Sequence, residues 1–306
     1  MLGLSESSSK TFCKIMKIIL SLIALLLALD YYCNAQSDTT EHYQVKVWSK
    51  QVIIGKVNGY APVTLYYYEA IGAAPGQPID LTLPGGSFIS NNNKETDSIC
   101  FHKAACGRSC FRMTYRTTLL FNIGEVTSNT DRCIYRGAED ARMTIRYIKQ
   151  NGKRYGCDTS IVNITGLSAG AMIALAVTYN YQLNYPAYKQ TKFPGHSTTI
   201  SKCASFWGAV LDLNLINRDV PLLMEHGTMD GLLPFTSGEA FGVFVYGSAS
   251  IHSWCDQHHY TSQLDGWTNY GHGLTKHYDA AGKPLPNNTY HNLRICANRS
   301  IMFFYR

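Results

Sequence analysis

Residues 160–179 read SIVNITGLSAGAMIALAVTY, and this stretch decides how the rest of the chain is interpreted. The apolar start predicts a buried strand, and the small apolar residues 169–179 predict a buried helix. Gly166 and Gly170 lie two residues before and two residues after Ser168. A turn that joins a strand directly to a helix leaves no room for side chains at those positions. The pattern therefore predicts that Ser168 projects from the carboxyl end of a sheet, at a helix N-terminus that favours negative charge.

A Gly-x-Ser-x-Gly sequence also occurs by chance. The alternative is an ordinary turn in which Ser168 caps the helix with its hydroxyl. The organisation of the chain and three further motifs distinguish the two interpretations.

Strand and helix patterns alternate along most of the chain, which predicts a mostly parallel central sheet with helices on both faces. Predicted strands lie at residues 43–57, 63–70, 78–87, 111–117, 160–165, 204–213 and 221–226. Helices are predicted at residues 137–151 and 169–179, and loops at 91–109 and 180–202. Because no repeat or linker divides the chain, we expect a single domain over residues 36–306.

Several motifs resemble those of the α/β-hydrolase carboxylesterases, and the similarity runs from about residue 43 to residue 306. They are Leu83-Pro84-Gly85-Gly86-Ser87-Phe88, Tyr115-Arg116, Ala138-Glu139-Asp140 and Tyr155-Gly156-Cys157-Asp158. The first resembles the family's glycine-rich oxyanion loop, although Pro84 stands where a His is usual. The resemblance implies an α/β-hydrolase fold, a nucleophile at Ser168, and oxyanion donors on the backbone of Ala169 and of Gly86 or Ser87.

The resemblance also implies an acid and a base. The apolar stretch 221–226 breaks into His226-Gly-Thr-Met-Asp230, which places Asp230 in the turn after a strand, with His226 as a structural residue. The base is expected at His272, on the loop Gly271-His272-Gly273, with His258, His259, His277 and His291 as rivals. The order Ser168, Asp230, His272 is that of the α/β-hydrolases.

Composition restricts the remaining classes of function. Only 16% of the 306 residues are charged and 12% are aromatic, which excludes intrinsic disorder. The formal net charge of +6 is spread along the chain without a long basic run, so we expect no nucleic-acid partner. The chemistry described above requires no metal and no organic cofactor.

The N-terminal segment resembles an export signal. The apolar stretch at residues 18–29 follows Lys14 and Lys17 and precedes Cys33-Asn34-Ala35, so we expect a secretory signal peptide at residues 1–35 and a secreted product. Twelve apolar residues are too few to span a bilayer, so no stable membrane span is expected after cleavage. An uncleaved anchor and a start at Met16 are the alternatives.

Eight cysteines remain after residue 35, and in an exported chain they favour disulfides over zinc. The predicted topology suggests pairing Cys157 with Cys203 and Cys255 with Cys296. The other four, Cys100, Cys106, Cys110 and Cys133, would pair among themselves. Sequons begin at Asn163, Asn287 and Asn298; Asn163 is expected to be buried and unmodified, and Asn287 is the best acceptor for a sugar.

Together these features predict a secreted serine hydrolase that cleaves carboxylic esters through an acyl-enzyme. The alternatives are a catalytically silent binding module on the same fold and a secreted serine peptidase, which would usually need an additional domain. Residues 181–193 and 235–254 are rich in aromatic side chains and are candidates to line the pocket. The sequence selects no particular ester, whether small or polymeric, and no oligomeric state.

Overall fold

The computed structural model describes residues 38–52, 63–90, 94–117, 129–182, 189 and 191–305, together with five positions between residues 16 and 22. The rest of the predicted signal peptide lies outside the described residues, as do residues 53–57 of the first predicted strand. Among the helices of the described part, none has the length and apolar character needed to cross a bilayer.

An eight-stranded sheet runs through the described part of the chain in the order β1-β2-β4-β3-β5-β6-β8-β11. The first two neighbouring pairs, β1 with β2 and β2 with β4, are antiparallel, and every later pair is parallel. The predicted mostly parallel sheet is therefore confirmed. Its strands are β1 (Val45–Gln51), β2 (Thr64–Ala70), β3 (Gln77–Leu83), β4 (Cys110–Met113), β5 (Cys157–Leu167), β6 (Lys202–Phe206), β8 (Leu222–Gly227) and β11 (Ser262–Trp267).

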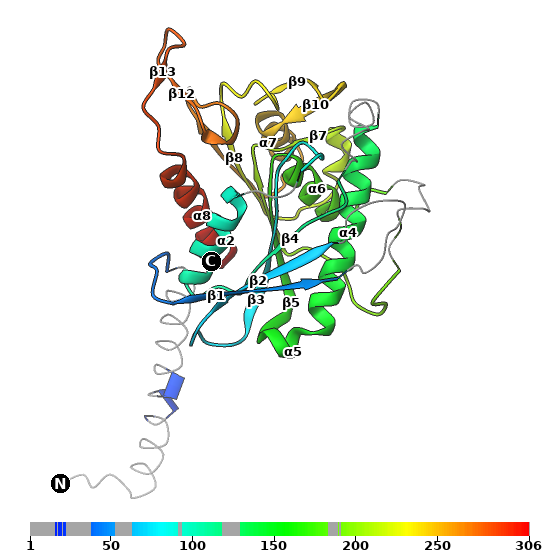
Figure 1. The fold of residues 1–306 in the computed structure, drawn as a ribbon, viewed down its shortest axis with the longest axis vertical. Coiled ribbons are helices and arrows are strands. Elements are labelled where there is room, and N and C mark those ends of the chain that lie inside the picture. The colour runs from blue at the N-terminus through cyan, green and yellow to red at the C-terminus, as the bar shows by residue number, and fades with distance from the viewer. Residues whose placement is uncertain are drawn as a thin grey trace, which may run out of the picture.

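Helices cover both faces of this sheet (Figure 1). On one face lie α4 (Thr130–Gln150), α5 (Gly152–Tyr155), α6 (Ala169–Thr178) and α7 (Ser248–Gln257); on the other lie α2 (Lys94–Ala105) and α8 (Thr289–Tyr305). Alternate residues of one strand enter different cores: Leu222 and Met224 pack on the α6 face and Leu223 on the α8 face. This is the expected period of a strand buried on both sides.

Short elements follow the carboxyl ends of the parallel strands. A three-stranded sheet contains β7 (Ala209–Val210), β9 (Ser237–Ala240) and β10 (Val243–Gly247), and a hairpin contains β12 (His277–Tyr278) and β13 (Pro284–Leu285). Two 3₁₀ turns, η2 (Leu213–Leu215) and η3 (His272–Leu274), complete this end. The predicted strand 204–213 is wrong as a single strand, because the chain turns at Trp207, where φ is +42°, before β7 pairs with β10.

Residues 94–105 form helix α2 where the sequence predicted a polar loop. The buried face of this helix includes Thr96, His102 and Lys103, so it lacks the apolar period by which amphipathic helices are recognised. Helix α4 also begins at Thr130 instead of Gly137. A Cβ at Gly137 would lie 2.4 Å from Ile173 of α6, so this glycine marks a helix crossing and not a helix start.

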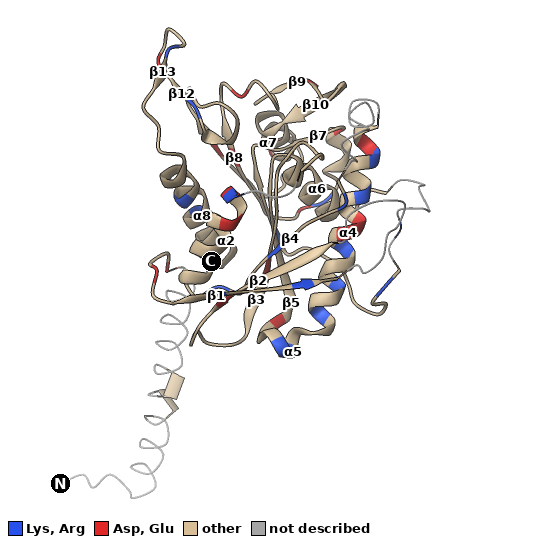
Figure 2. Ribbon diagram, in the orientation of Figure 1, with Lys and Arg blue, Asp and Glu red and all other residues tan. Residues whose placement is uncertain are grey.

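Charges of both signs are interspersed along α4, and the short helix α5 carries only two basic residues, Lys153 and Arg154 (Figure 2). The expectation that nucleic acid is not a partner remains a prediction.

The cysteine layout predicted from topology is wrong. All eight described cysteines are free thiols. In the sheet, Cys203 lies beside Ile164 and not beside Cys157. On the neighbouring strand β3, Ile164 pairs with Leu81 and Cys157 with Gln77, four residues or about 13 Å away along the strand. Cys255 and Cys296 lie in the cores on opposite faces of the sheet. Neither predicted pair can reach the separation of about 5.5 Å between Cα atoms that a disulfide requires.

The remaining four cysteines are divided in the same way. Cys133 packs on the α6 face and Cys106 on the α8 face, whereas Cys100 and Cys110 share one small cluster with Tyr68 and Ala104. Burial raises the pKa of the Cys110 thiol well above its ordinary value, and a hydrogen bond with Cys100 adds to the shift. Among the described residues, no three His, Cys, Asp or Glu side chains gather as metal ligands would.

A buried ion pair joins α2 to the sheet. The Nζ atom of Lys103 lies 3.1 and 3.0 Å from the two carboxylate oxygens of Asp80 on β3 and donates to Oγ1 of Thr165 at 2.9 Å. Both charged side chains are fully buried. Burial raises the pKa of Asp80, and the ammonium of Lys103 opposes that shift. The pair lies beneath β5, the strand that leads to Ser168.

Replacing one member of this pair should destabilise the fold more than replacing both. Lys103→Met leaves the carboxylate of Asp80 buried without its cation, which costs about 3 to 5 kcal/mol in such pairs. The double variant Lys103→Met, Asp80→Asn removes both charges and should recover most of that loss. Urea unfolding of the three proteins measures the effect, and a double variant no more stable than Lys103→Met would contradict this account.

Candidate active site

Ser168 occupies a strained turn between β5 and α6. Its φ and ψ are +54° and −120°, and its side chain makes no capping hydrogen bond to the helix. A Cβ at Gly166 would lie 2.2 Å from the carbonyl oxygen of Gly170, and a Cβ at Gly170 would lie 2.4 Å from that of Leu83. Both glycines are therefore required by close backbone approach. The alternative in which Ser168 caps the helix is wrong.

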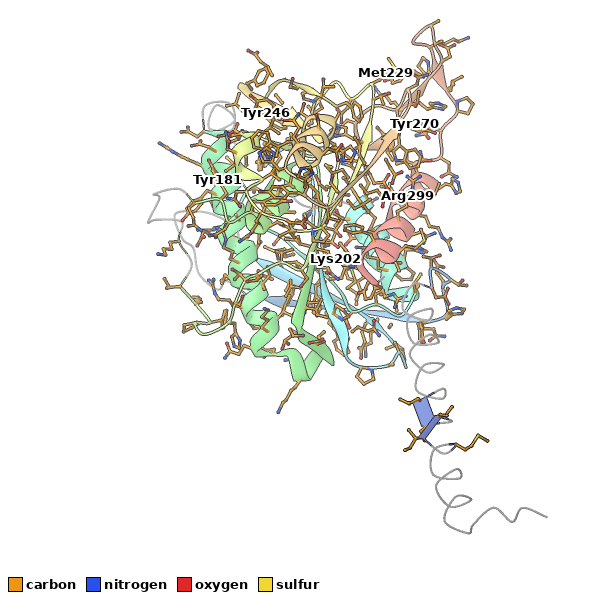
Figure 3. All side chains as sticks on the ribbon, turned by 180° about the vertical axis from the view of Figure 1, so that it is seen from behind. Tyr181, Lys202, Met229, Tyr246, Tyr270 and Arg299 are labelled. Atoms are coloured by element: carbon orange, nitrogen blue, oxygen red, sulfur yellow. The ribbon has the colours of Figure 1, made fainter. Side chains whose placement is uncertain are left out.

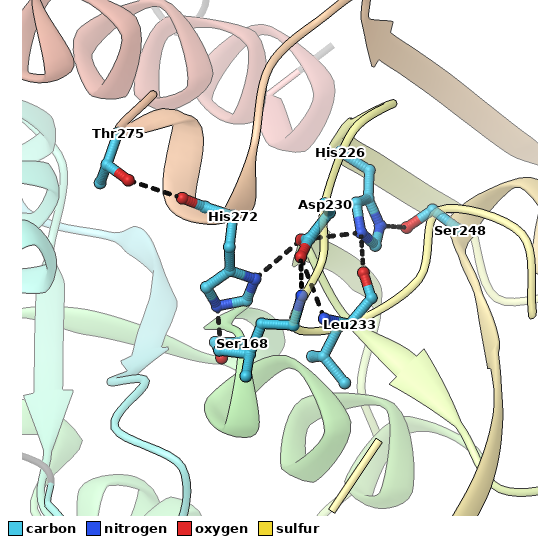
Figure 4. A network of polar contacts seen from close by, with 8 residues as sticks. Ser168, His226, Asp230, Leu233, Ser248, His272 and Thr275 are labelled. Atoms are coloured by element: carbon cyan, nitrogen blue, oxygen red, sulfur yellow. Dashed lines mark hydrogen bonds and ion pairs between the residues drawn. The ribbon is translucent and has the colours of Figure 1, made fainter. Parts of the chain in front are cut away.

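The structure brings together the three residues that the sequence proposed as a triad (Figure 4). The Nε2 atom of His272 lies 2.9 Å from Oγ of Ser168, and its Nδ1 atom lies 2.7 Å from Oδ2 of Asp230. Asp230 follows β8, and His272 begins η3, after β11. Because β5, β8 and β11 run parallel, their carboxyl ends deliver all three side chains to one edge of the sheet.

The four rival histidines lie elsewhere. His258 stacks between Trp254 and Tyr260, and His277 stacks on Tyr270 with 4.2 Å between ring centroids. His259 and His291 are exposed. None of the four has a hydrogen bond to Ser168 or to Asp230 within the described part of the chain.

Asp230 is held as a carboxylate by several donors. Its Oδ1 atom accepts hydrogen bonds from the backbone N–H groups of Leu232 and Leu233, at 2.8 and 3.0 Å. Burial alone would raise the pKa of Asp230, but the hydrogen bonds from His226 and His272 outweigh it and hold that pKa well below its usual range. The acid therefore stays ionised wherever His272 needs a negative partner.

His226 contacts the acid directly, which the sequence did not predict. Its Nε2 atom lies 3.2 Å from Oδ2 of Asp230 and 3.0 Å from the carbonyl oxygen of Leu233, while its Nδ1 atom pairs with Oγ of Ser248 at 2.8 Å. Nε2 therefore carries the proton, and the Ser248 hydroxyl donates to Nδ1. The signal in the sequence was the four-residue spacing of His226 and Asp230 within one turn.

The predicted oxyanion donors line the pocket or begin the helix beside it. Gly86 and Ser87 form its wall, with φ of +118° and +52°, and Ala169 is the first residue of α6. Their backbone N–H groups make no hydrogen bond to any other described residue. Despite the missing His, the loop is anchored, because the Tyr115 hydroxyl donates to the carbonyl oxygen of Pro84 at 3.1 Å.

A second ion pair connects two of the motifs found in the sequence, Tyr115-Arg116 and Ala138-Glu139-Asp140. Arg116 donates from its backbone N–H and from Nε to the carboxylate of Asp140, each at 2.8 Å. Both side chains are buried. The pair ties the segment after β4, which carries Tyr115, to helix α4. The oxyanion loop is thus supported from beneath by a fixed backbone.

Ser168 opens into a pocket of about 540 Å³ at the carboxyl ends of the parallel strands. Its apolar walls are Trp207, Met229 and Leu232, and its polar rim includes Glu95, Thr275, Lys276 and Tyr278. Figure 3 shows Met229 and Tyr270 at this end of the molecule, above Lys202, the first residue of β6, which lies nearer its middle. The ring of Trp207 meets that of His272 edge-on, with 6.5 Å between centroids.

The sequence missed Trp207 and chose other aromatics for the pocket. None of residues 235–254 lines it. Tyr181 lines a separate apolar cavity between α4 and α6, and Phe193 packs on Tyr147. Residues 183–188 and 190 lie outside the described part. Trp207 directly follows β6, at the edge where catalytic groups gather, but the sequence placed it inside the predicted strand 204–213 and so gave no signal for it.

A larger groove of about 870 Å³ lies between α2, α8 and the first two strands. It contains neither Ser168 nor His272, and its charged side chains include the salt-bridged Arg112 and Asp97. By volume alone this groove would be the first candidate for the active site, but Ser168 and His272 line the smaller pocket.

Comparison with known proteins agrees with this architecture. The BD-FAE family model matches residues 67–218, just under half of the chain. No curated protein matches the sequence at a significant level. Native esterase 2 of the planctomycete Thermogutta terrifontis is 18% identical and superposes with a TM-score of 0.59, covering 86% of this chain and 92% of its own. A truncated carbohydrate esterase from gut microbiota is 13% identical, with a TM-score of 0.58 and coverage of 85% and 98%. The chain has the α/β-hydrolase fold.

Beneath the pocket, Glu225 on β8 is a buried acid that the sequence analysis did not select. Its Oε2 atom accepts hydrogen bonds from Nε1 of Trp267 at 2.6 Å and from Arg299 at 2.9 Å, and its backbone oxygen accepts from the N–H of Trp207 at 2.6 Å. Burial raises the pKa of Glu225 to about 7, although both side-chain donors favour the ionised form.

The raised pKa of Glu225 predicts a pH-dependent stability. Between its ordinary pKa of 4.5 and about 7, the folded protein keeps a proton that the unfolded chain loses. The free energy of unfolding that Glu225 contributes is fully present below pH 4.5 and falls as the pH rises through 7. Glu225→Gln should remove this slope. Urea unfolding at pH 5 and pH 8 checks it, and parallel pH dependence in the two proteins would contradict the assignment.

Proposed function

We propose that the protein is a serine hydrolase of carboxylic esters, with Ser168 as nucleophile, His272 as base and Asp230 as acid. The observation that carries the proposal is the continuous hydrogen-bonded chain from Ser168 through His272 to Asp230, which opens into the pocket. The likeness to the BD-FAE family model and to esterase structures supports the same class.

In the first half of the reaction, His272 Nε2 accepts the proton of the Ser168 hydroxyl as Oγ attacks the acyl carbon. The Nδ1–H of the resulting imidazolium donates to Asp230, whose ionised carboxylate stabilises that charge. The negative oxygen of the tetrahedral intermediate accepts hydrogen bonds from the backbone of Ala169 and of Gly86 or Ser87. His272 then returns the proton to the alcohol, which leaves.

In the second half, water replaces the alcohol. His272 takes a proton from the water as the hydroxide attacks the acyl-enzyme, and the same donors hold the second oxyanion. The proton passes back to Oγ of Ser168 and the carboxylic acid leaves. The cycle consumes one ester and one water, and it requires no group beyond those of the chain.

The geometry favours this proposal over a silent binding module, and a pair of substrates separates it from a peptidase. A silent binding module would tolerate a broken triad, yet here all three side chains are within hydrogen-bonding distance. A serine peptidase of this fold would use the same triad on an amide bond. Hydrolysis of p-nitrophenyl acetate compared with that of a matched p-nitroanilide separates the two.

Ser168→Ala should reduce kcat/KM for p-nitrophenyl acetate on the order of 10⁴-fold or more, because no other group supplies the nucleophile. Paraoxon, which phosphorylates the Thermogutta terrifontis esterase, should label the peptide that contains Ser168 in the native protein. Ser253→Ala is the matched control, since Ser253 is an exposed serine of α7. Activity of Ser168→Ala within tenfold of the native value would rule out this nucleophile.

We further propose that the chain is exported and loses residues 1–35. In an oxidising compartment, Cys100 and Cys110 are the pair that the fold can join, since they lie in one small cluster and their thiols are hydrogen-bonded. Thiol–disulfide exchange with oxidised glutathione would form the Cys100–Cys110 bond, and the two electrons and two protons would pass to glutathione, giving two molecules of its reduced form. Asn163 is fully buried and is proposed to remain unmodified.

Protein collected from the medium of a secretory host should begin at Gln36 and yield one peptide pair that joins Cys100 to Cys110 under non-reducing digestion. The other six cysteines should alkylate once the protein is unfolded without reductant. Cys100→Ser should abolish the cross-link and leave those six unchanged. A cross-link between Cys157 and any other cysteine would contradict the proposed pair.

A further inference from the structure

The turn that carries His272 has an unusual backbone. After His272, Gly273 and Leu274 both lie in the left-handed region, with φ of +65° and +54°. Glycine adopts this conformation readily, but Leu274 does not. Leu274 is fully buried, so its conformation is fixed by the contacts around it. Contacts from outside the turn must stabilise the backbone of Leu274 if the imidazole of His272 is to keep its position.

Two asparagine amides hold the carbonyl oxygen of Leu274. The Nδ2 atom of Asn287, which precedes α8, donates to it at 2.7 Å, and the Nδ2 atom of Asn292, within α8, donates to it at 3.3 Å. Nδ2 of Asn292 also donates to Oδ1 of Asn287 at 2.8 Å, so the two amides orient each other. Asn292 is buried, and helix α8 packs on the rest of the fold.

We propose that Asn287 and Asn292 are positioning residues, which we call the amide clamp, and that they hold the His272 turn against α8. The clamp acts on the carbonyl of Leu274, two residues after His272, and therefore on the ring placed between Ser168 and Asp230. This inference rests on the proposed function of that triad.

The clamp also bears on sugar attachment. Asn287 begins a sequon, and the sequence alone made it the best acceptor. Its Nδ2 atom, however, is the atom that would carry the sugar, and it already bonds Leu274. A sugar would replace one N–H at a half-buried position beside the His272 turn. Asn287 should therefore be unglycosylated in the active protein.

Asn287→Asp tests the clamp with little change in shape. The carboxylate cannot donate, so it places a charged oxygen against the carbonyl of Leu274. We expect kcat/KM for p-nitrophenyl acetate to fall about 10- to 100-fold, mainly through kcat, because a displaced base affects chemistry more than binding. Asn151→Asp is the matched control. The Nδ2 atom of Asn151 also donates to a backbone carbonyl, but the acceptor is Tyr147 of α4 and not a residue of the His272 turn. It should stay within twofold of native activity.

Double substitution separates positioning from general weakening. If Asn287 acts through His272, then Asn287→Asp should have no further effect on the residual activity of His272→Ala. An equal loss in both backgrounds would overturn the proposal, as would native kcat in Asn287→Asp. Should that variant not fold, Asn287→Ala, which removes the donor without adding a charge, makes the same comparison.

The glycan is tested on protein secreted by a glycosylating host and separated by lectin affinity. Material with sugar at Asn287 should be absent or should show the reduced kcat of Asn287→Asp. Fully active material with sugar there would overturn the proposal. Retained activity in Ser168→Ala would instead defeat the proposed function, so the two failures remain distinguishable.

Discussion

The close approach of two backbones at Ser168 is the constraint on which the rest of the structure depends. A Cβ at Gly166 or Gly170 would lie within 2.4 Å of a carbonyl oxygen, so β5 can meet α6 only if both residues are glycine. This contact fixes the position of Ser168 at the sheet edge and brings the start of α6 against the end of β3. The oxyanion loop follows directly from β3, which is why nucleophile and loop share one wall of the pocket.

The parallel strands then place the partners of Ser168 at the same edge of the sheet as Ser168 itself. Asp230 follows β8 and His272 follows β11, and the register of these neighbouring strands places both strand ends at one edge. A similar close approach secures them, since a Cβ at Gly227 would lie 2.2 Å from the carbonyl oxygen of Tyr270. The acid turn and the base loop therefore pack on each other, and His226 and the amide clamp hold each from its outer side.

Local patterns predicted the fold class and the turn at Ser168 because steric rules act within a few residues, and the sequence 166–170 permits only one kind of turn. The resemblance to the α/β-hydrolases, and not a local rule, assigned Asp230 to the turn after a strand and His272 to a glycine-flanked loop. The pocket wall at Trp207 could not be predicted in this way, because its position depends on a bend after β6 and on Glu225 of a neighbouring strand. Helix α2 was missed because its buried side chains include Lys103, whose burial depends on Asp80.

The same reasoning explains why the cysteine layout failed. Pairing requires two side chains on one face and at one height along the sheet, and sequence patterns report neither the register of Cys203 against β5 nor the face on which α7 packs. Contacts that join distant segments support the site here, and each of them consists of polar groups buried against a carbonyl or a carboxylate. A buried polar group must find its partner or lose stability, so these contacts allow only one placement of the loops that carry Ser168, Asp230 and His272.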